Sequence, residues 1–174
     1  MNLTALITGT LVIIVFSWFF SVKHKRFHGI PRFFAFESIY LLVLINLKIW
    51  FHDPLSLNQI ISWILLILSA YAGIAGYLLL KGKGKPSGNF ENTTILVKAG
   101  IYSLIRHPLY LSLFLLGTGV MMKDLNIPTL TLGAVSLVAI YFTALIEEKE
   151  MEERFGTAYR QYMKETKMFI PFIL

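Results

Sequence analysis

The sequence predicts an all-α fold, a polytopic membrane bundle of about five transmembrane helices with an amphipathic helix at its cytoplasmic C-terminal end. Hydrophobic residues make up 56% of the 174 residues, and the mean hydropathy is +0.66. Charged residues make up only 15%, whereas a soluble domain usually carries about 25%. Apolar segments of roughly twenty residues also recur along the chain, and a helix of that length crosses a hydrocarbon core of about 30 Å.

The first two apolar segments differ in their charges. Residues 3–22 contain none, and basic residues follow this segment instead of preceding it, which favours a retained helix over a signal peptide. Residues 33–51 contain Glu37 and Lys48. A charge at the centre of a bilayer costs roughly 2.5 to 3.5 kcal/mol on insertion scales. The two side chains therefore either anchor the helix at the membrane surface or belong to a functional site.

Three further spans are predicted after the first two. Residues 57–80 form the third, and its small residues, among them Gly73 and Gly76, suit close packing against another helix. A polar loop, residues 81–94, follows. Residues 109–122 predict a short fourth span of about 21 Å. The turn to the fifth span, residues 127–146, is so short that the two helices must pack as an antiparallel hairpin.

The last part of the chain is amphipathic. From residue 147 onward the segment is highly charged, and apolar side chains recur at helical spacing at Met151, Phe155, Tyr159 and Tyr162. This pattern predicts a helix that leaves the membrane and bends near Gly156. The apolar tail, residues 168–174, is expected to fold back onto the bundle. We therefore expect an N-terminal three-span part, residues 1–80, and a C-terminal part, residues 81–174, that carries the hairpin and the candidate site.

The basic residues predict the orientation. With five spans, fourteen of the sixteen Lys and Arg residues fall on one side of the membrane, and only Lys48 and Lys123 lie near the other. The positive-inside rule then places the N-terminus outside and the C-terminus in the cytoplasm. A net charge of +6 would also suit a nucleic-acid-binding protein, but basic residues between apolar spans indicate anionic lipid headgroups as partner and no nucleic acid. The chain has no cysteine, which excludes disulfides and cysteine nucleophiles.

The most informative stretch is residues 100–110, in which Arg106 and His107 stand directly before Pro108 and an uncharged segment. Proline suits the first position of a helix, where its missing N–H would have no partner in any case. The first turn of this helix presents unpaired N–H groups and the positive end of the helix dipole. Arg106 and His107 therefore lie at a position suited to a carboxylate or a phosphate. Alternatively, Arg106 only anchors the helix at the headgroups.

Two adjacent carboxylates, Glu147 and Glu148, are expected at the same membrane level as this site, because the predicted hairpin begins at Pro108 and ends just before Glu147. Carboxylates opposite a cationic helix end can bind a zwitterion or the hydroxyls of a sugar. A ligand with a carboxylate, an ammonium and a ribose would meet complementary groups there. No glycine-rich fingerprint follows a predicted strand, which excludes a Rossmann-type cofactor site on pattern.

Several motifs occur in a fixed order along residues 88–174, and they are Gly100-Ile-Tyr102, Arg106-His107-Pro108-Leu109-Tyr110, Glu147-Glu148, Phe155-Gly156-Thr-Ala-Tyr159 with Tyr162, and Phe169-Ile170-Pro171. This set resembles the membrane methyltransferases of the isoprenylcysteine carboxyl methyltransferase and phospholipid methyltransferase superfamily. The resemblance implies S-adenosylmethionine as methyl donor and S-adenosylhomocysteine as product. It also implies a lipophilic or small membrane-permeant acceptor, either an isoprenylcysteine carboxylate, a phospholipid amine or a thiol.

The resemblance implies which residues form the site. The catalytic residues would be Arg106, His107 and Glu147. The cofactor-binding residues would be Leu96, Val97, Tyr102, Arg106, His107, Pro108, Leu109, Tyr110, Glu147 and Glu148, with no metal. Two positions depart from the prenylcysteine enzymes, since Thr94 replaces a histidine and Thr143 replaces a substrate-contacting arginine. A buried carboxylate without its cation is poorly held, so a prenylcysteine carboxylate is the less favoured acceptor.

The expected chemistry is compatible with these residues. Methyl transfer from a sulfonium requires alignment of donor and acceptor and exclusion of water, without a metal. A thiolate or carboxylate acceptor needs no general base, whereas an ammonium must first lose a proton, for which His107 or a glutamate would serve. Two alternatives stay open at this point. One is a non-enzymatic membrane scaffold or transporter that retains the motif, and the other is a phospholipid-binding subunit that needs a partner for activity.

Overall fold

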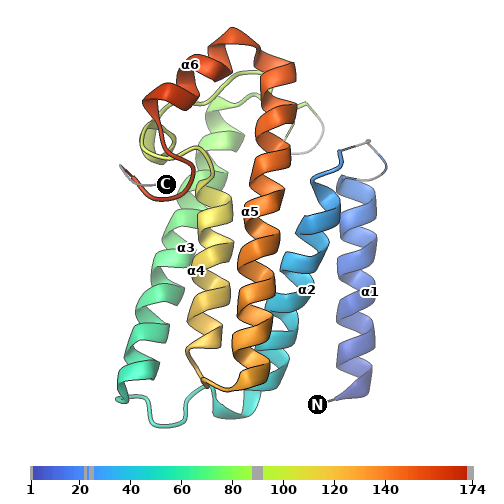
Figure 1. Ribbon diagram of the computed structural model, residues 1–174, viewed down its shortest axis with the longest axis vertical. Coiled ribbons are helices and arrows are strands. Elements are labelled where there is room, and N and C mark those ends of the chain that lie inside the picture. The colour runs from blue at the N-terminus through green and yellow to red at the C-terminus, as the bar shows by residue number, and fades with distance from the viewer. Residues whose placement is uncertain (1, 22, 24–25, 88–91, 172–174) are drawn as a thin grey trace.

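The protein is a bundle of five long helices that run side by side, with a short sixth helix across one end (Figure 1). The computed structural model describes residues 2–21, 23, 26–87 and 92–171. The elements are α1 (Leu3–Phe20), α2 (Gly29–Asn46), η2 (Leu47–Ile49), α3 (Leu57–Lys83), η3 (Gly100–Ser103), α4 (Pro108–Met121), α5 (Ile127–Phe155) and α6 (Thr157–Glu165). Successive long helices alternate in direction, as five membrane crossings require.

In the described part of the chain, four helices are long and apolar enough to cross a membrane, namely α1, α2, α3 and α5. The fifth crossing, α4, is apolar but has only 14 residues, which matches the short fourth span predicted from the sequence. The predicted polytopic helical bundle is therefore confirmed. The prediction for α2 was wrong at both ends, because α2 begins at Gly29 and not at residue 33, and gives way to the 3₁₀ turn η2 after Asn46. Pro31 is accommodated because it lies in the first turn.

Local sequence signals explain where α5 begins and ends. Asn126 caps its start, since its side chain accepts from the Thr129 N–H while the Thr129 hydroxyl accepts from the Asn126 N–H, each at 3.0 Å. The helix continues without a break beyond the apolar segment to Phe155, as the amphipathic pattern predicted. It ends at Gly156, whose φ of +57° is a left-handed conformation that favours glycine. The chain then turns into α6, so the predicted bend at Gly156 is confirmed.

The helices pack in pairs, with α3 along α4 and α2 along α5. Small residues allow the close approach of α3 to α4, since a Cβ at Gly73 would stand 2.8 Å from the Ser112 Oγ. Polar side chains also cross this interface, because Ser62 donates a hydrogen bond to the Gly119 carbonyl at 2.6 Å and Ser69 donates to the Ser112 carbonyl at 2.8 Å. The packing role predicted for the glycines of the third span is therefore confirmed.

Glu37 lies in the contact between α1 and α2. The Thr10 hydroxyl donates to its carboxylate at 2.6 Å, and the Tyr40 hydroxyl donates to the Ala5 carbonyl of α1 at 2.5 Å. A hydrogen bond to a charged group in an apolar environment is stronger than one between neutral groups. Glu37 therefore serves to attach α1 to α2, and neither of the two roles considered for it from the sequence, membrane anchor or part of a site, describes this contact.

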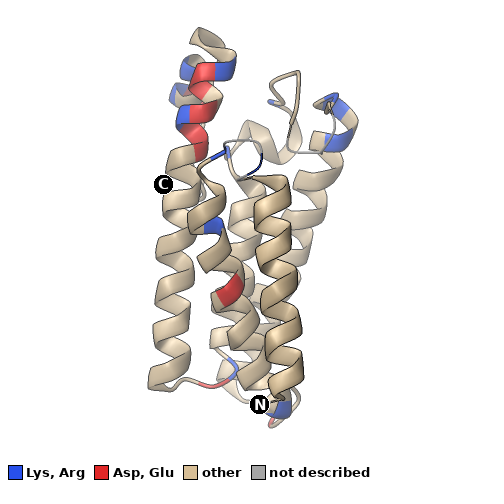
Figure 2. Cartoon of the chain, turned by 90° about the vertical axis from the view of Figure 1, so that its right-hand side faces the viewer, with Lys and Arg blue, Asp and Glu red and all other residues tan. Residues whose placement is uncertain are grey.

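Buried side chains of α2, α4, α5 and the C-terminal tail form the core, which includes Ala35, Ile39, Tyr110, Ala139, Ile140, Ala144, Met168 and Phe169. The tail thus folds back onto the bundle, as predicted for its described residues; residues 172–174 lie outside the described part. Charged residues are concentrated at the end of the bundle where α6 lies, and only isolated charges occur along its length (Figure 2). The described basic clusters therefore share one side of the membrane, as the five-span topology requires.

The packing of α3 against α4 yields a test with a matched control. A Cβ at Gly119 would stand 3.2 Å from the Leu65 Cβ, whereas a Cβ at Gly82 would meet open space. We expect Gly119→Leu to destabilise the bundle by about 1 to 3 kcal/mol through overpacking, and Gly82→Leu to leave its stability unchanged. Thermal unfolding in detergent, followed by circular dichroism, measures the difference. Equal midpoints for the two variants would contradict the packing described for α3 and α4.

Candidate active site

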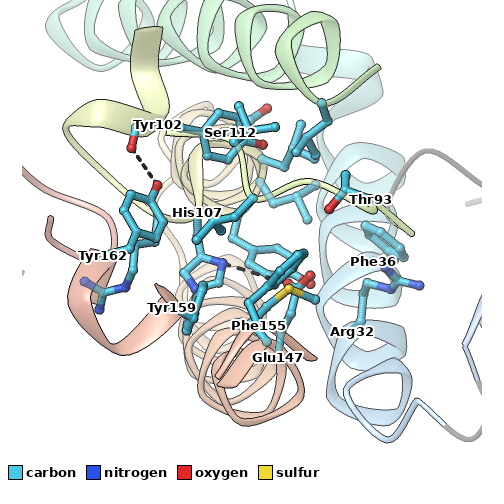
Figure 3. A pocket seen from close by; sticks show the side chains of 18 of the residues that line it. Arg32, Phe36, Thr93, Tyr102, His107, Ser112, Glu147, Phe155, Tyr159 and Tyr162 are labelled. Atoms are coloured by element: carbon cyan, nitrogen blue, oxygen red, sulfur yellow. Dashed lines mark hydrogen bonds and ion pairs between the residues drawn. The ribbon is translucent and has the colours of Figure 1, made fainter. Parts of the chain in front are cut away.

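A cavity of about 280 Å³ lies at the charged end of the bundle. Helices from both halves of the sequence form its wall, together with the segment that joins α3 to α4 (Figure 3). Its lining is mostly apolar and aromatic with a few ionisable groups, which is the usual character of a small-molecule site. The cavity therefore provides a mostly apolar space beside the sequence motifs at Arg106 and Glu147.

Eight of the sequence-predicted site residues line the cavity, and they are Leu96, Val97, Tyr102, Arg106, His107, Leu109, Tyr110 and Glu147. The structure thus brings together residues that are separated by up to 51 positions in the chain, from Leu96 to Glu147. Two predicted residues, Pro108 and Glu148, do not line it. Pro108 is the first residue of α4, where it packs towards Gly76 of α3. Glu148 lies behind the cavity wall, where it contacts Arg106 and His107, and both of these residues line the cavity.

The C-terminal tail holds the Arg106-His107 segment by its backbone. The Arg106 N–H donates to the Lys167 carbonyl at 2.8 Å, and the His107 N–H donates to the Met168 carbonyl at 3.1 Å. Main-chain pairing of this kind satisfies groups that would otherwise be buried without partners. The start of α4 is therefore fixed in position by a segment that lies sixty residues further along the chain.

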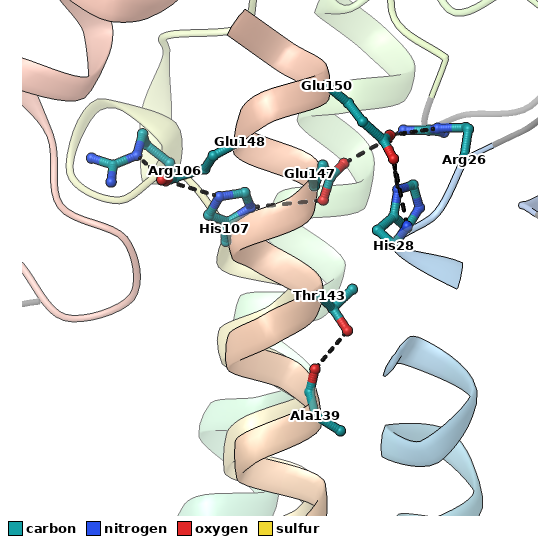
Figure 4. A network of polar contacts seen from close by, with 9 residues as sticks. All are labelled: Arg26, His28, Arg106, His107, Ala139, Thr143, Glu147, Glu148 and Glu150. Atoms are coloured by element: carbon teal, nitrogen blue, oxygen red, sulfur yellow. Dashed lines mark hydrogen bonds and ion pairs between the residues drawn. The ribbon is translucent and has the colours of Figure 1, made fainter. Parts of the chain in front are cut away.

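Glu148 fixes the side chains of the same two residues. Its Oε1 accepts from the Arg106 Nε at 2.6 Å and lies 3.3 Å from the His107 Nε2 (Figure 4). Arg106 also donates to the carbonyls of Met163 and Thr166, at 3.3 and 2.5 Å. The Arg106 guanidinium is thus engaged in joining α4, α5 and the end of α6. We propose that these contacts give Arg106 and Glu148 a positioning role, whereas the sequence suggested both as ligand-binding groups.

Glu147 lies at the cavity wall within a second set of charges. Its carboxylate is 3.8 Å from the His107 Nδ1 and 3.7 Å from the Arg26 Nη2. One turn further on, Glu150 accepts from Arg26 at 3.2 Å and contacts the buried His28 at 2.9 Å. The described part of the α1–α2 connection is therefore bound to α5 directly beside Glu147, and this arrangement orients the carboxylate (Figure 4).

Three tyrosines form an aromatic side of the cavity. The Tyr162 hydroxyl donates to the Tyr102 carbonyl at 2.5 Å, and Tyr159 lies against Tyr162 with ring centroids 5.9 Å apart. Burial raises the pKa of Tyr102, Tyr159 and Tyr162 well above the usual value for tyrosine, so their hydroxyls stay neutral. They can therefore donate hydrogen bonds and offer flat apolar faces to a ligand over the whole physiological pH range.

Sequence reasoning missed three groups of lining residues. One group, from α3, α4 and the segment between them, consists of Leu80, Thr93, Ser112 and Leu113. Met151, Phe155, Tyr159 and Tyr162 were recognised as the apolar face of the amphipathic helix but were not assigned to the site, and they line it. Phe16, Arg32 and Phe36 come from α1 and α2, which were interpreted as membrane spans only. For Arg32 the signal was its position at the beginning of an apolar segment. Arg32 was overlooked because the start of α2 was predicted four residues too late, which placed Arg32 outside the helix.

Two departures from the prenylcysteine enzymes can be located in the structure. Thr143 exposes only 1% of its surface, and its hydroxyl donates to the Ala139 carbonyl of its own helix at 2.7 Å (Figure 4). Thr94 donates to the Lys85 carbonyl at 2.8 Å. Neither residue lines the cavity. Within the described residues no group of three His, Cys, Asp or Glu side chains is placed to hold a metal ion.

The fold and the site define a polytopic helical membrane protein with a ligand cavity at the basic end of its bundle. The family model of the phospholipid methyltransferases matches residues 57–158, which is more than half of the 174 residues. The chain therefore belongs to the phospholipid methyltransferase family, and the resemblance found in its motifs is confirmed. The matched region includes α3, α4 and α5 and most of the cavity wall.

The chain is similar to several curated proteins, including three methyltransferases. The protein-S-isoprenylcysteine O-methyltransferase of Saccharomyces cerevisiae is 34% identical over 84 residues, which are 48% of this chain and 35% of the yeast protein. The methanethiol S-methyltransferase of Crocosphaera subtropica is 25% identical over 202 aligned positions, which cover 97% of this chain and 77% of that protein. Methanethiol S-methyltransferase 1 of Bradyrhizobium diazoefficiens is 32% identical over 76 residues, 41% of this chain and 24% of that one. The chain thus spans about a third of the yeast relative.

The positioning role of Glu148 predicts a difference between two glutamates of the C-terminal part. Glu148 pairs with Arg106 at 2.6 Å with side chains that are each 9% exposed, whereas Glu165 pairs with Lys98 at 3.8 Å with side chains 51% and 40% exposed. Breaking a buried ion pair costs about 3 to 5 kcal/mol, and breaking an exposed one costs about 0 to 1 kcal/mol. We therefore expect Glu148→Gln, but not Glu165→Gln, to lower the thermal unfolding midpoint in detergent. A midpoint unchanged in Glu148→Gln would refute the positioning role.

Proposed function

We propose that the protein is an integral membrane methyltransferase that transfers a methyl group from S-adenosylmethionine to a lipophilic or small membrane-permeant acceptor. The observation that carries this proposal is the cavity itself, which gathers the motif residues Tyr102, His107 and Glu147 at the end of a membrane bundle. Membership of the family and the names of the similar proteins support the reaction class.

The cavity residues fit the functional groups of the proposed donor. Glu147 supplies a carboxylate for an ammonium or for ribose hydroxyls, and the aromatic faces of Tyr102 and Tyr159 suit an adenine ring. The first turn of α4, which starts at Pro108, directs N–H groups towards the end of the bundle where the cavity lies, and these suit a carboxylate. When bound, S-adenosylmethionine supplies an electrophilic methyl group attached to a sulfonium sulfur.

The cavity residues promote methyl transfer by aligning the donor with the acceptor and by excluding water. Leu96, Val97 and Leu109 provide apolar wall, so the reacting groups are desolvated, and Glu147 and His107 orient the donor through polar contacts. An amine acceptor would additionally need a base, and His107 is the candidate for this role because it lines the cavity. We thus assign catalytic roles to His107 and Glu147, with Arg106 holding His107 in place through Glu148.

We further propose that the charged end of the bundle faces the cytoplasm and that the N-terminus lies outside, because the positive-inside rule applies to the described basic residues at that end. In this orientation the donor, which is water-soluble, reaches the cavity from the cytoplasm, whereas the acceptor enters from the lipid. Residues 81–174 would then form the catalytic part and residues 1–80 the three-span part that completes the cavity wall.

Binding of S-adenosylhomocysteine tests this proposal. We expect the purified protein in detergent or lipid nanodiscs to bind it with a dissociation constant in the micromolar range. Glu147→Ala should weaken binding by at least about tenfold, because a charge-assisted hydrogen bond is lost. Glu153→Ala, on an exposed position of the same helix, serves as control and should bind like the wild type. Isothermal titration calorimetry measures all three.

Absence of binding in a folded sample, repeated in lipid, would reject the methyltransferase and favour the membrane scaffold that retains the motif. Activity that appears only with a co-purified second chain would favour the phospholipid-binding subunit. Wild-type affinity in Glu147→Ala would leave the reaction class intact but remove the proposed role of Glu147.

A further inference from the structure

Arg32 is unusually well buried for a charged residue in the first turn of a membrane-spanning helix. It lies in α2, exposes only 2% of its surface and lines the cavity, where Figure 3 shows it next to Phe36. Charged residues within membrane-spanning helices are costly and commonly mark substrate or ion sites. The guanidinium also stays protonated at every physiological pH, so this part of the cavity wall carries a permanent positive charge.

The surroundings of Arg32 hold it in a defined orientation. Its guanidinium carbon lies 5.8 Å from the Phe16 ring centroid and 5.9 Å from the Phe36 ring centroid, within cation–π range. Its Nη2 donates a hydrogen bond to the Ser21 hydroxyl at the end of α1. Ser21 can approach because residue 29 is glycine, since a Cβ there would stand 2.2 Å from the Ser21 Cβ. The side chain is therefore built into the wall that α1 and α2 form.

Arg32 is also separated in the chain from the residues assigned to the donor. Those residues all come from positions 96–159, whereas Arg32, Phe16 and Phe36 come from the first two helices. Phe16 and Phe36 are half-buried aromatic residues on helices of the membrane bundle, so this side of the cavity combines apolar surface with one cation. A ligand that fits it has an apolar body and a negatively charged group.

The charge balance of methyl transfer also favours an anionic acceptor at this position. An electron pair of the acceptor sulfur or oxygen forms a bond to the methyl carbon, the bond from that carbon to the sulfonium sulfur breaks, and its electron pair stays on the donor sulfur. An anionic acceptor and the cationic donor thereby become two neutral products. A neutral amine would instead become an ammonium, and a positive charge near Arg32 in a low-dielectric cavity is unfavourable.

Resting on the proposed methyl transfer, we propose that Arg32 binds the reacting group of an anionic acceptor, a thiolate or a carboxylate on an apolar body, and disfavours amine acceptors. A thiol would release its proton to solvent before the step, and Arg32 would stabilise the resulting anion. Once methylated, the neutral product loses its attraction to Arg32, which assists its release.

A binding measurement tests this role without turnover. In nanodiscs saturated with S-adenosylhomocysteine, octanoate and octanamide are compared, because they have the same chain and differ in the charge of the head group. We expect the wild type to bind octanoate at least about tenfold more tightly, as a cation within hydrogen-bond reach should allow. Arg32→Gln should lose this preference, and Arg32→Lys should retain part of it. Arg160→Gln, at an exposed basic position of α6, should behave like the wild type.

Measurements of turnover provide a second test, because a purely structural role of Arg32 would not change the pH dependence of the rate. With methanethiol as acceptor, Arg32→Gln should raise KM about tenfold or more and shift the rising limb of the rate against pH to higher pH, because the thiolate is less stabilised. With an S-prenylated N-acetylcysteine the KM should rise without that shift, since a carboxylate is already ionised at neutral pH. Comparing the two acceptors therefore shows whether Arg32 acts on a thiolate or on a carboxylate. Phosphatidylethanolamine should be a poor acceptor for the wild type.

The results separate failure of this inference from failure of the proposed function. Equal binding of octanoate and octanamide by the wild type, or efficient methylation of phosphatidylethanolamine, would overturn the role of Arg32 while S-adenosylhomocysteine still binds. A parallel loss of S-adenosylhomocysteine affinity in Arg32→Gln would assign Arg32 to the donor and also overturn it. If Arg32→Gln does not fold, Ser21→Ala replaces it, and an undiminished preference for octanoate in that variant would count against the inference.

Discussion

The buried contact of Glu148 with Arg106 and His107 is the constraint on which the rest of the site depends. It joins the start of α4, the membrane exit of α5 and, through the carbonyls that Arg106 binds, the end of α6. Because charges in a low-dielectric environment are stable only with good geometry, these elements must adopt one relative position. Glu147, the preceding residue, lies about 100° away around the same helix and lines the cavity.

The apolar helices set the distances between these charges. Pairing of α2 with α5 and of α3 with α4 requires small residues and a few interhelical hydrogen bonds, such as the one from Ser62 to the Gly119 carbonyl. The bundle thereby brings the connections α1–α2 and α3–α4 to the same end as α6. The polar groups of the cavity thus lie on segments between spans and on the parts of α2 and α5 nearest this end, and the packing of the spans fixes where these groups meet.

Much of this arrangement could be predicted from the sequence, because hydrophobic length and charge distribution are local signals. They predicted the spans, a glycine in the amphipathic segment predicted the bend at Gly156, and the motifs shared with the resembled family implied eight of the lining residues. The pairing of Arg106 with Glu148 could not be predicted, because it depends on which of two adjacent glutamates faces α4. Arg32 was missed for a related reason, since its role depends on a helix start at Gly29 that allows contact with Ser21. Contacts between distant segments leave no periodic pattern in the chain.

The position of α1 has a consequence for the shape of the cavity. This helix packs chiefly on α2, and only 6% of the residues in its apolar stretch are buried. Its Phe16 nevertheless lines the cavity. The family model matches residues 57–158 and leaves α1 and α2 outside. A peripheral helix can be exchanged with little cost to the core, while each exchange alters the shape of the cavity. Chimeras that replace α1 alone would therefore measure how far the part of the cavity wall that this helix forms determines which acceptors are used.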